Sequence, residues 1–88
     1  GLGFHGLAQP LGQAIKNGRQ ILSFYIEFNK SFRGLLQLEL FDEFGNPTDS
    51  CLVELSQQKG QKQFVDFKFM SHKNLLQSEF GLLKLEEL

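Results

Sequence analysis

Residues 21–28 read Ile-Leu-Ser-Phe-Tyr-Ile-Glu-Phe, so a large apolar side chain recurs at every second position. The residues on one face of an extended chain are all apolar: Leu22, Phe24, Ile26 and Phe28. The opposite face carries Ser23, Tyr25 and Glu27. A period of two is typical of a β-strand with one buried face. Because a slip of one residue would bury Glu27, the pattern also predicts which face of the strand meets the core.

The same alternation predicts four further strands, at residues 35–41, 51–55, 63–69 and 80–85. Their expected inward residues are Leu36, Leu38, Leu40, Cys51, Val53, Leu55, Val65, Phe67 and Phe69. Polar segments rich in Gly, Asn and Pro, and a polar tip at residues 57–62, separate the strands and suit tight turns. The alternation therefore predicts one all-β domain over residues 1–88, an antiparallel β-sandwich of about six strands.

Two segments depart from this alternation. Residues 1–20 are rich in glycine and are expected to form an edge strand at residues 4–9 or a loop, because Pro10 suits an edge. Residues 12–18 are expected to be a loop or a single helical turn. Residues 71–78 form a longer connection that we expect to hold one helical turn around Leu75 and Leu76.

Charge and cysteine content exclude several classes of function. The 88 residues contain 9 Lys and Arg against 10 Asp and Glu, for a net charge of −1. Nucleic-acid binding and attachment to anionic membranes both need a basic surface, so neither partner is expected. No apolar run is long enough to span a bilayer. The single cysteine excludes an internal disulfide and a multi-cysteine zinc site.

Candidate catalytic groups are few. Cys51 falls on the apolar face of its strand, where a thiol normally packs as a small hydrophobe. His5 and His72 lie far apart in the sequence, and no nucleophile–base pair, phosphate-binding loop or metal-ligand spacing is present. The sequence therefore predicts neither an enzyme nor a cofactor.

The loop at residues 42–49 is the strongest candidate for a metal site. Asp42, Glu43, Asn46 and Asp49 offer the oxygen atoms that Ca²⁺ prefers. The spacing differs from that of an EF-hand, and Asp, Gly, Asn and Pro are also the residues that a hairpin loop needs. The loop is the favoured interpretation, and a calcium site is the alternative.

Five stretches carry a resemblance to a known family. They are GLAQPL (6–11), NGRQILSFYI (17–26), LELFDEFGN (38–46), QFVDFKF (63–69) and LKL (83–85). In this order they resemble the jelly-roll carbohydrate-binding modules and related galactose-binding-like sandwiches. The resemblance implies a jelly-roll fold, an extracellular or surface location and a sugar ligand. The face it implies consists of Tyr25, Glu27, Gln37, Glu39, Asp66 and Lys68, with Tyr25 stacking on a sugar ring and the others hydrogen-bonding to hydroxyls.

A second hypothesis is a structural or assembly domain of a virion, fibre, surface layer or enzyme. Five large apolar residues fall outside the clean inward sets: Phe32, Phe41, Phe44, Leu52 and Leu82. An exposed patch of this kind is typical of a surface that binds another protein chain, including a second copy of the same chain. Ten Phe against one Tyr and no Trp also favour apolar packing, because Phe lacks a polar group.

Overall fold

The computed structural model describes the backbone of residues 2–10 and the backbone and side chains of residues 18–88. These residues form six strands and one short helix. The elements are β1 (Leu2–Pro10), β2 (Ile21–Glu27), β3 (Phe32–Phe41), β4 (Pro47–Gln57), β5 (Lys62–Lys68), α1 (His72–Leu76) and β6 (Phe80–Glu87). The all-β prediction is therefore confirmed. Within these ranges, no helix has the length and apolar character needed to cross a bilayer.

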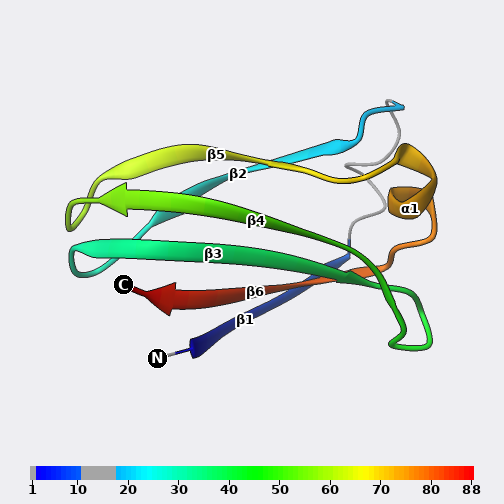
Figure 1. Ribbon diagram of the computed structural model, residues 1–88, viewed down its shortest axis with the longest axis horizontal. Helices are drawn as coiled ribbons and strands as arrows, with labels where there is room; N and C mark the ends of the chain where they lie inside the picture. The colour runs from blue at the N-terminus through cyan, green and yellow to red at the C-terminus, as the bar shows by residue number, and fades with distance from the viewer. Residues whose placement is uncertain (1, 11–17) are drawn as a thin grey trace.

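The strands form two antiparallel sheets (Figure 1). The larger sheet has the order β1-β6-β3-β4, and the smaller one pairs β2 with β5. The helix α1 lies between β5 and β6 in the chain, at the end of the molecule where β5 ends (Figure 1). The strand β6 thus fills the place between β1 and β3, although β1 and β3 are much earlier in the sequence.

The hydrophobic core contains residues from both sheets and from α1. Leu36 and Leu40 of β3, Phe67 of β5 and Leu75 of α1 are fully buried. The other buried core residues are Leu22, Phe32, Leu38, Leu55, Val65 and Phe69, and the partly buried residues against them include Phe24, Ile26, Phe28, Cys51 and Val53. The predicted inward faces of β2, β3, β4 and β5 are therefore confirmed.

Several strands are longer than the sequence predicts. The ladder between β3 and β4 runs from the Phe32–Gln57 pair to the Phe41–Pro47 pair, so both strands extend beyond the predicted 35–41 and 51–55. Pro47 is the first residue of β4, where its missing N–H group is tolerated. The predicted edge strand at residues 4–9 falls within β1, which pairs with β6. The predicted loop or turn at residues 12–18 lies, apart from Gly18, outside the described residues.

The prediction for Phe32 is wrong. We expected this side chain at an exposed interface, but it is only 4% exposed. Because β3 begins at Phe32, the alternation of β3 continues back from Leu36 and turns Phe32 toward the core. Its ring stacks on that of Phe28, with the ring centroids 4.4 Å apart and the planes 11° from parallel.

Candidate functional site

The outward face of the smaller sheet is an open, regular surface. It consists of the outward side chains of β2 and β5, and we call it the outer β2–β5 face. All eight are exposed: Ile21, Ser23, Tyr25, Glu27, Lys62, Phe64, Asp66 and Lys68. They form four cross-strand pairs, in order Ile21–Lys68, Ser23–Asp66, Tyr25–Phe64 and Glu27–Lys62.

An exposed aromatic pair lies in the middle of this face. Tyr25 is 67% exposed and Phe64 is 56% exposed, and their ring centroids are 4.8 Å apart with the planes tilted by 53°. The Lys62 Nζ atom lies 5.2 Å from the centroid of the Tyr25 ring, within the range of a cation–π interaction. The pair therefore offers two apolar ring surfaces to solvent beside a cation.

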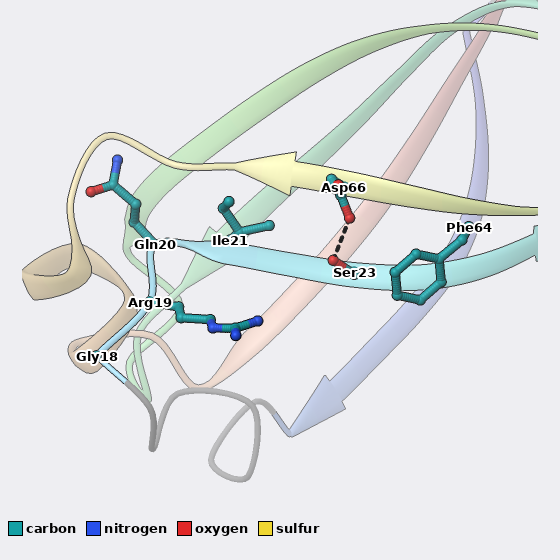
Figure 2. Close-up of a pocket in the computed structure, with 7 residues that line it drawn as sticks. All are labelled: Gly18, Arg19, Gln20, Ile21, Ser23, Phe64 and Asp66. Atoms are coloured by element: carbon teal, nitrogen blue, oxygen red, sulfur yellow. Dashed lines mark hydrogen bonds between the residues drawn. The ribbon is translucent and has the colours of Figure 1, made fainter.

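Polar groups and a hollow adjoin the aromatic pair on the side of the Ser23–Asp66 pair. The Ser23 Oγ atom donates a hydrogen bond to Asp66 Oδ1, 2.5 Å away. The hollow has a volume of about 720 Å³ and is lined by Gly18, Arg19, Gln20, Ile21, Ser23, Phe64 and Asp66 (Figure 2). Figure 2 shows the Arg19 side chain running along β2 toward Ser23. A ligand here would meet an aromatic ring, a hydroxyl–carboxylate pair and a guanidinium group.

The structure divides the six predicted ligand residues between the two sheets. Tyr25, Glu27, Asp66 and Lys68 share the outer β2–β5 face. Gln37 and Glu39 belong to β3 of the larger sheet. They therefore do not join the other four.

Glu39 is also already paired. Its Oε1 atom accepts a hydrogen bond from Lys84 Nζ of β6 at 2.7 Å. Both side chains of this ion pair are about one-fifth exposed, at 22% and 21%. This pair ties β3 to β6, so Glu39 has a structural partner within the sheet.

The remaining predicted interface residues are exposed to different degrees. Phe44, in the loop between β3 and β4, and Leu52 of β4 are largely exposed. Phe41 and Leu82 are half-buried on the larger sheet. Phe44 also lines a second hollow, together with Leu76 of α1.

In the acidic loop, hydrogen bonds within the chain occupy the Asp42 carboxylate. Asp42 Oδ1 accepts hydrogen bonds from the backbone N–H groups of Asn46 (2.8 Å) and Phe44 (2.9 Å). These bonds, above all the one from Asn46, lower the pKa of the Asp42 carboxyl group below its ordinary value of 3.8. Such bonds are those of a closed turn, which is the interpretation that the sequence favours.

Asp49 fixes the helix to β4. Its Oδ2 atom accepts hydrogen bonds from the backbone N–H of Met70 (2.9 Å) and from Asn74 Nδ2 (3.0 Å). Ser71 caps α1 by accepting a bond from the Asn74 N–H group. Within residues 18–88, no group of three or more His, Cys, Asp or Glu side chains is placed to hold a metal ion.

Cys51 lies on the inward side of β4, partly buried against the core. Burial raises the pKa of its thiol, so the thiol stays in its protonated form, which is the less nucleophilic one. The expectation that Cys51 packs as a small hydrophobe fits this position. His72 begins α1, and the side chain of His5 lies outside the described residues.

Several residues of the outer β2–β5 face and its hollow were not predicted as site residues, among them Ser23, Phe64, Lys62 and Arg19. Phe64 shares the parity of Asp66 and Lys68, so its outward direction follows from the same alternation. Lys62 comes from a segment that the sequence predicts as a polar turn. Arg19 precedes β2, and no periodic pattern signals where its side chain lies.

Comparisons with protein-family models, curated proteins and solved structures find no match to this chain.

Proposed function

We propose that the chain is a non-catalytic binding domain that binds carbohydrate on the outer β2–β5 face. The observation that carries the proposal is the exposed Tyr25–Phe64 pair, with its centroids 4.8 Å apart, beside the hydrogen-bonded Ser23 and Asp66. A sugar ring has an apolar C–H face that packs on an aromatic ring and hydroxyl groups that need polar partners. The outer β2–β5 face supplies both kinds of group next to each other.

Each polar side chain has a distinct role in this proposal. The Asp66 carboxylate accepts hydrogen bonds from sugar hydroxyls, and the Ser23 hydroxyl group can donate or accept. Glu27 and Lys68 lie at opposite ends of the face and contact neighbouring sugar units. Gln37 and Glu39 are left out, because they belong to the other sheet.

We also propose that the two sheets form a β-sandwich of jelly-roll type. A core made from the inward residues of both sheets supports this arrangement. Under this proposal, the smaller sheet binds the ligand on its exposed outward face, and the larger sheet packs against its inward face.

A calorimetric titration with neutral oligosaccharides and polysaccharides tests carbohydrate binding. Tyr25→Ala and Phe64→Ala should each weaken binding about three- to tenfold, since an aromatic contact contributes about 0.5–1.5 kcal/mol. Phe44→Ala is the matched control, because it truncates an exposed aromatic residue in the loop between β3 and β4. Absence of binding at millimolar sugar, or unchanged binding in both face variants, would contradict the proposal.

A structural or assembly domain is the second candidate. The large exposure of Phe44 and Leu52 favours it, since both side chains present apolar surface to solvent. The strand β4 pairs with β3 and is an edge of the larger sheet, and such edges can pair with another chain. Light scattering over a range of concentrations tests self-association. A strictly monomeric protein would count against assembly of like chains.

A further inference from the structure

We infer that the saccharide bound by the outer β2–β5 face carries a carboxylate, as uronic acids do, and that Arg19 binds this carboxylate. The inference rests on the proposed function and names its ligand class. It is carried by the side chain of Arg19, which lines the same hollow as Phe64 and Asp66 (Figure 2).

Arg19 is available for an anionic ligand. Its side chain is exposed, and among residues 18–88 no carboxylate forms an ion pair with it. Asp66, the acidic residue that lines the same hollow, is hydrogen-bonded to Ser23. The planar guanidinium group can donate two parallel hydrogen bonds to the two oxygens of a carboxylate.

The charged groups of the outer β2–β5 face and Arg19 together carry a small excess of positive charge. Arg19, Lys62 and Lys68 contribute three positive charges, against two negative charges from Glu27 and Asp66. This local excess of one positive charge occurs on a chain whose net charge is −1. A local positive field raises the concentration of anionic ligands at the surface and accelerates their binding.

The remaining groups of the hollow require more than a simple carboxylic acid. Phe64 offers an apolar ring surface and Asp66 accepts hydrogen bonds from hydroxyls, so the ligand should combine a ring, hydroxyls and an acid group. Asp66 also repels a ligand carboxylate, and this repulsion directs the acid group toward Arg19. Successive outward positions along a strand are about 6.6 Å apart, so an oligosaccharide of a few units can reach from Tyr25 to Arg19.

The test compares two ligands that differ only in the acid group. The intact chain is titrated with oligogalacturonate and with its fully methyl-esterified form, in which the carboxylates are neutral. We expect the acid form to bind about tenfold more tightly at low ionic strength, and added salt to reduce the difference. Arg19→Gln should abolish the preference, and Arg19→Lys should restore part of it, because lysine keeps the charge but lacks the fork.

Arg33→Gln is the matched control, since it removes the same charge from an exposed position on β3 of the other sheet. It should leave the preference unchanged. Equal binding of acid and ester, or a preference that survives in Arg19→Gln, overturns the inference while leaving neutral carbohydrate binding intact. Equally tight binding of dextran sulfate indicates general attraction of anions and also overturns it. If no saccharide of either kind binds, the proposed function and the inference fail together.

Discussion

The outward faces of the two sheets differ in how exposed their side chains are to solvent. On the larger sheet, the outward residues of β3 are half-buried from Leu35 to Phe41, and Glu39 is paired with Lys84. On the smaller sheet, every outward residue of β2 and β5 is exposed. The reason is that β3 has a neighbour on each side, whereas β2 and β5 have only each other within the described sheets. Side chains on a central strand cover one another across the ladder, and those on a two-stranded sheet remain open to a ligand.

The comparison first predicts a large difference in stability between two phenylalanines of the same strand. Phe67→Ala should lower the free energy of unfolding by about 3–5 kcal/mol, because it empties a fully buried site in the core. Phe64→Ala, on the outward side of β5, should cost less than about 1 kcal/mol. Chemical denaturation of both variants measures the two values. Similar losses for both would show that the outer β2–β5 face is closed in solution.

A second prediction concerns oppositely charged residues on the two faces, Glu39 with Lys84 and the cross-strand neighbours Glu27 and Lys62. A double-mutant cycle with Glu39→Gln and Lys84→Met should give a coupling energy of about 1 kcal/mol, since both side chains are about four-fifths buried. The same cycle with Glu27→Gln and Lys62→Met should give a coupling near zero, because both residues are exposed. Equal coupling energies would remove the distinction between the faces.

A third prediction is a pH effect at the end of the larger sheet. The pKa of Asp42 is lowered in the folded chain by hydrogen bonds from the loop, so the stabilisation is present above the ordinary value of 3.8. It is lost as the pH falls through the lowered pKa. The Tm should therefore fall more steeply below pH 4 in the natural chain than in Asp42→Asn, with Glu43→Gln as the control in the same loop. Identical pH profiles for all three proteins would contradict this account.

The smallest expected effect concerns the chemical reactivity of the Cys51 thiol and not the stability of the fold. Because burial raises the pKa of this thiol, its alkylation by iodoacetamide at pH 8 should be slower than that of an unfolded peptide. The rate should rise to the peptide value in denaturant. Alkylation at the peptide rate without denaturant would show that the inward side of β4 is open.

The sequence could predict which side chains of most strands point toward the core, because the direction of a side chain along a strand is a local property. The alternation in residues 21–28 and 63–69 gives the inward sets correctly, since each side chain's direction depends only on its parity. The exposure of Tyr25 and Asp66 follows from the same rule. Four of the six residues predicted for a ligand were therefore placed on one face.

Strand neighbours could not be predicted in the same way, because pairing depends on contacts between distant segments. Nothing local shows that Gln37 lies on a different sheet from Tyr25, or that Lys84 neutralises Glu39. Gly34 illustrates the difficulty. It resembles a turn residue, but it lies inside β3, where a Cβ atom would collide with the Glu86 carbonyl oxygen of β6. The sequence therefore starts this strand too late and leaves Phe32 outside it.

Gln57 shows the same limit for polar residues. It belongs to a segment predicted as a polar tip, yet its side chain is buried. Its Nε2 atom donates hydrogen bonds to the carbonyl oxygens of Ile26 and Gln61. The amide thereby links the end of β2 to the turn that joins β4 and β5. A buried polar side chain normally has hydrogen-bond partners. Of the partners of Gln57, Ile26 comes from a distant segment, so it can be identified only once the fold is known.

The position of β6 between β1 and β3 has a consequence for the order in which the chain folds. During synthesis β1 and β3 leave the ribosome long before residues 80–87, so neither can acquire its β6 neighbour until those residues emerge. Until then the nascent chain has unpaired strand edges of the kind that invite aggregation. Pairings between such distant segments also form slowly. We therefore expect the larger sheet to be completed late, and premature termination before Phe80 to leave an aggregation-prone product.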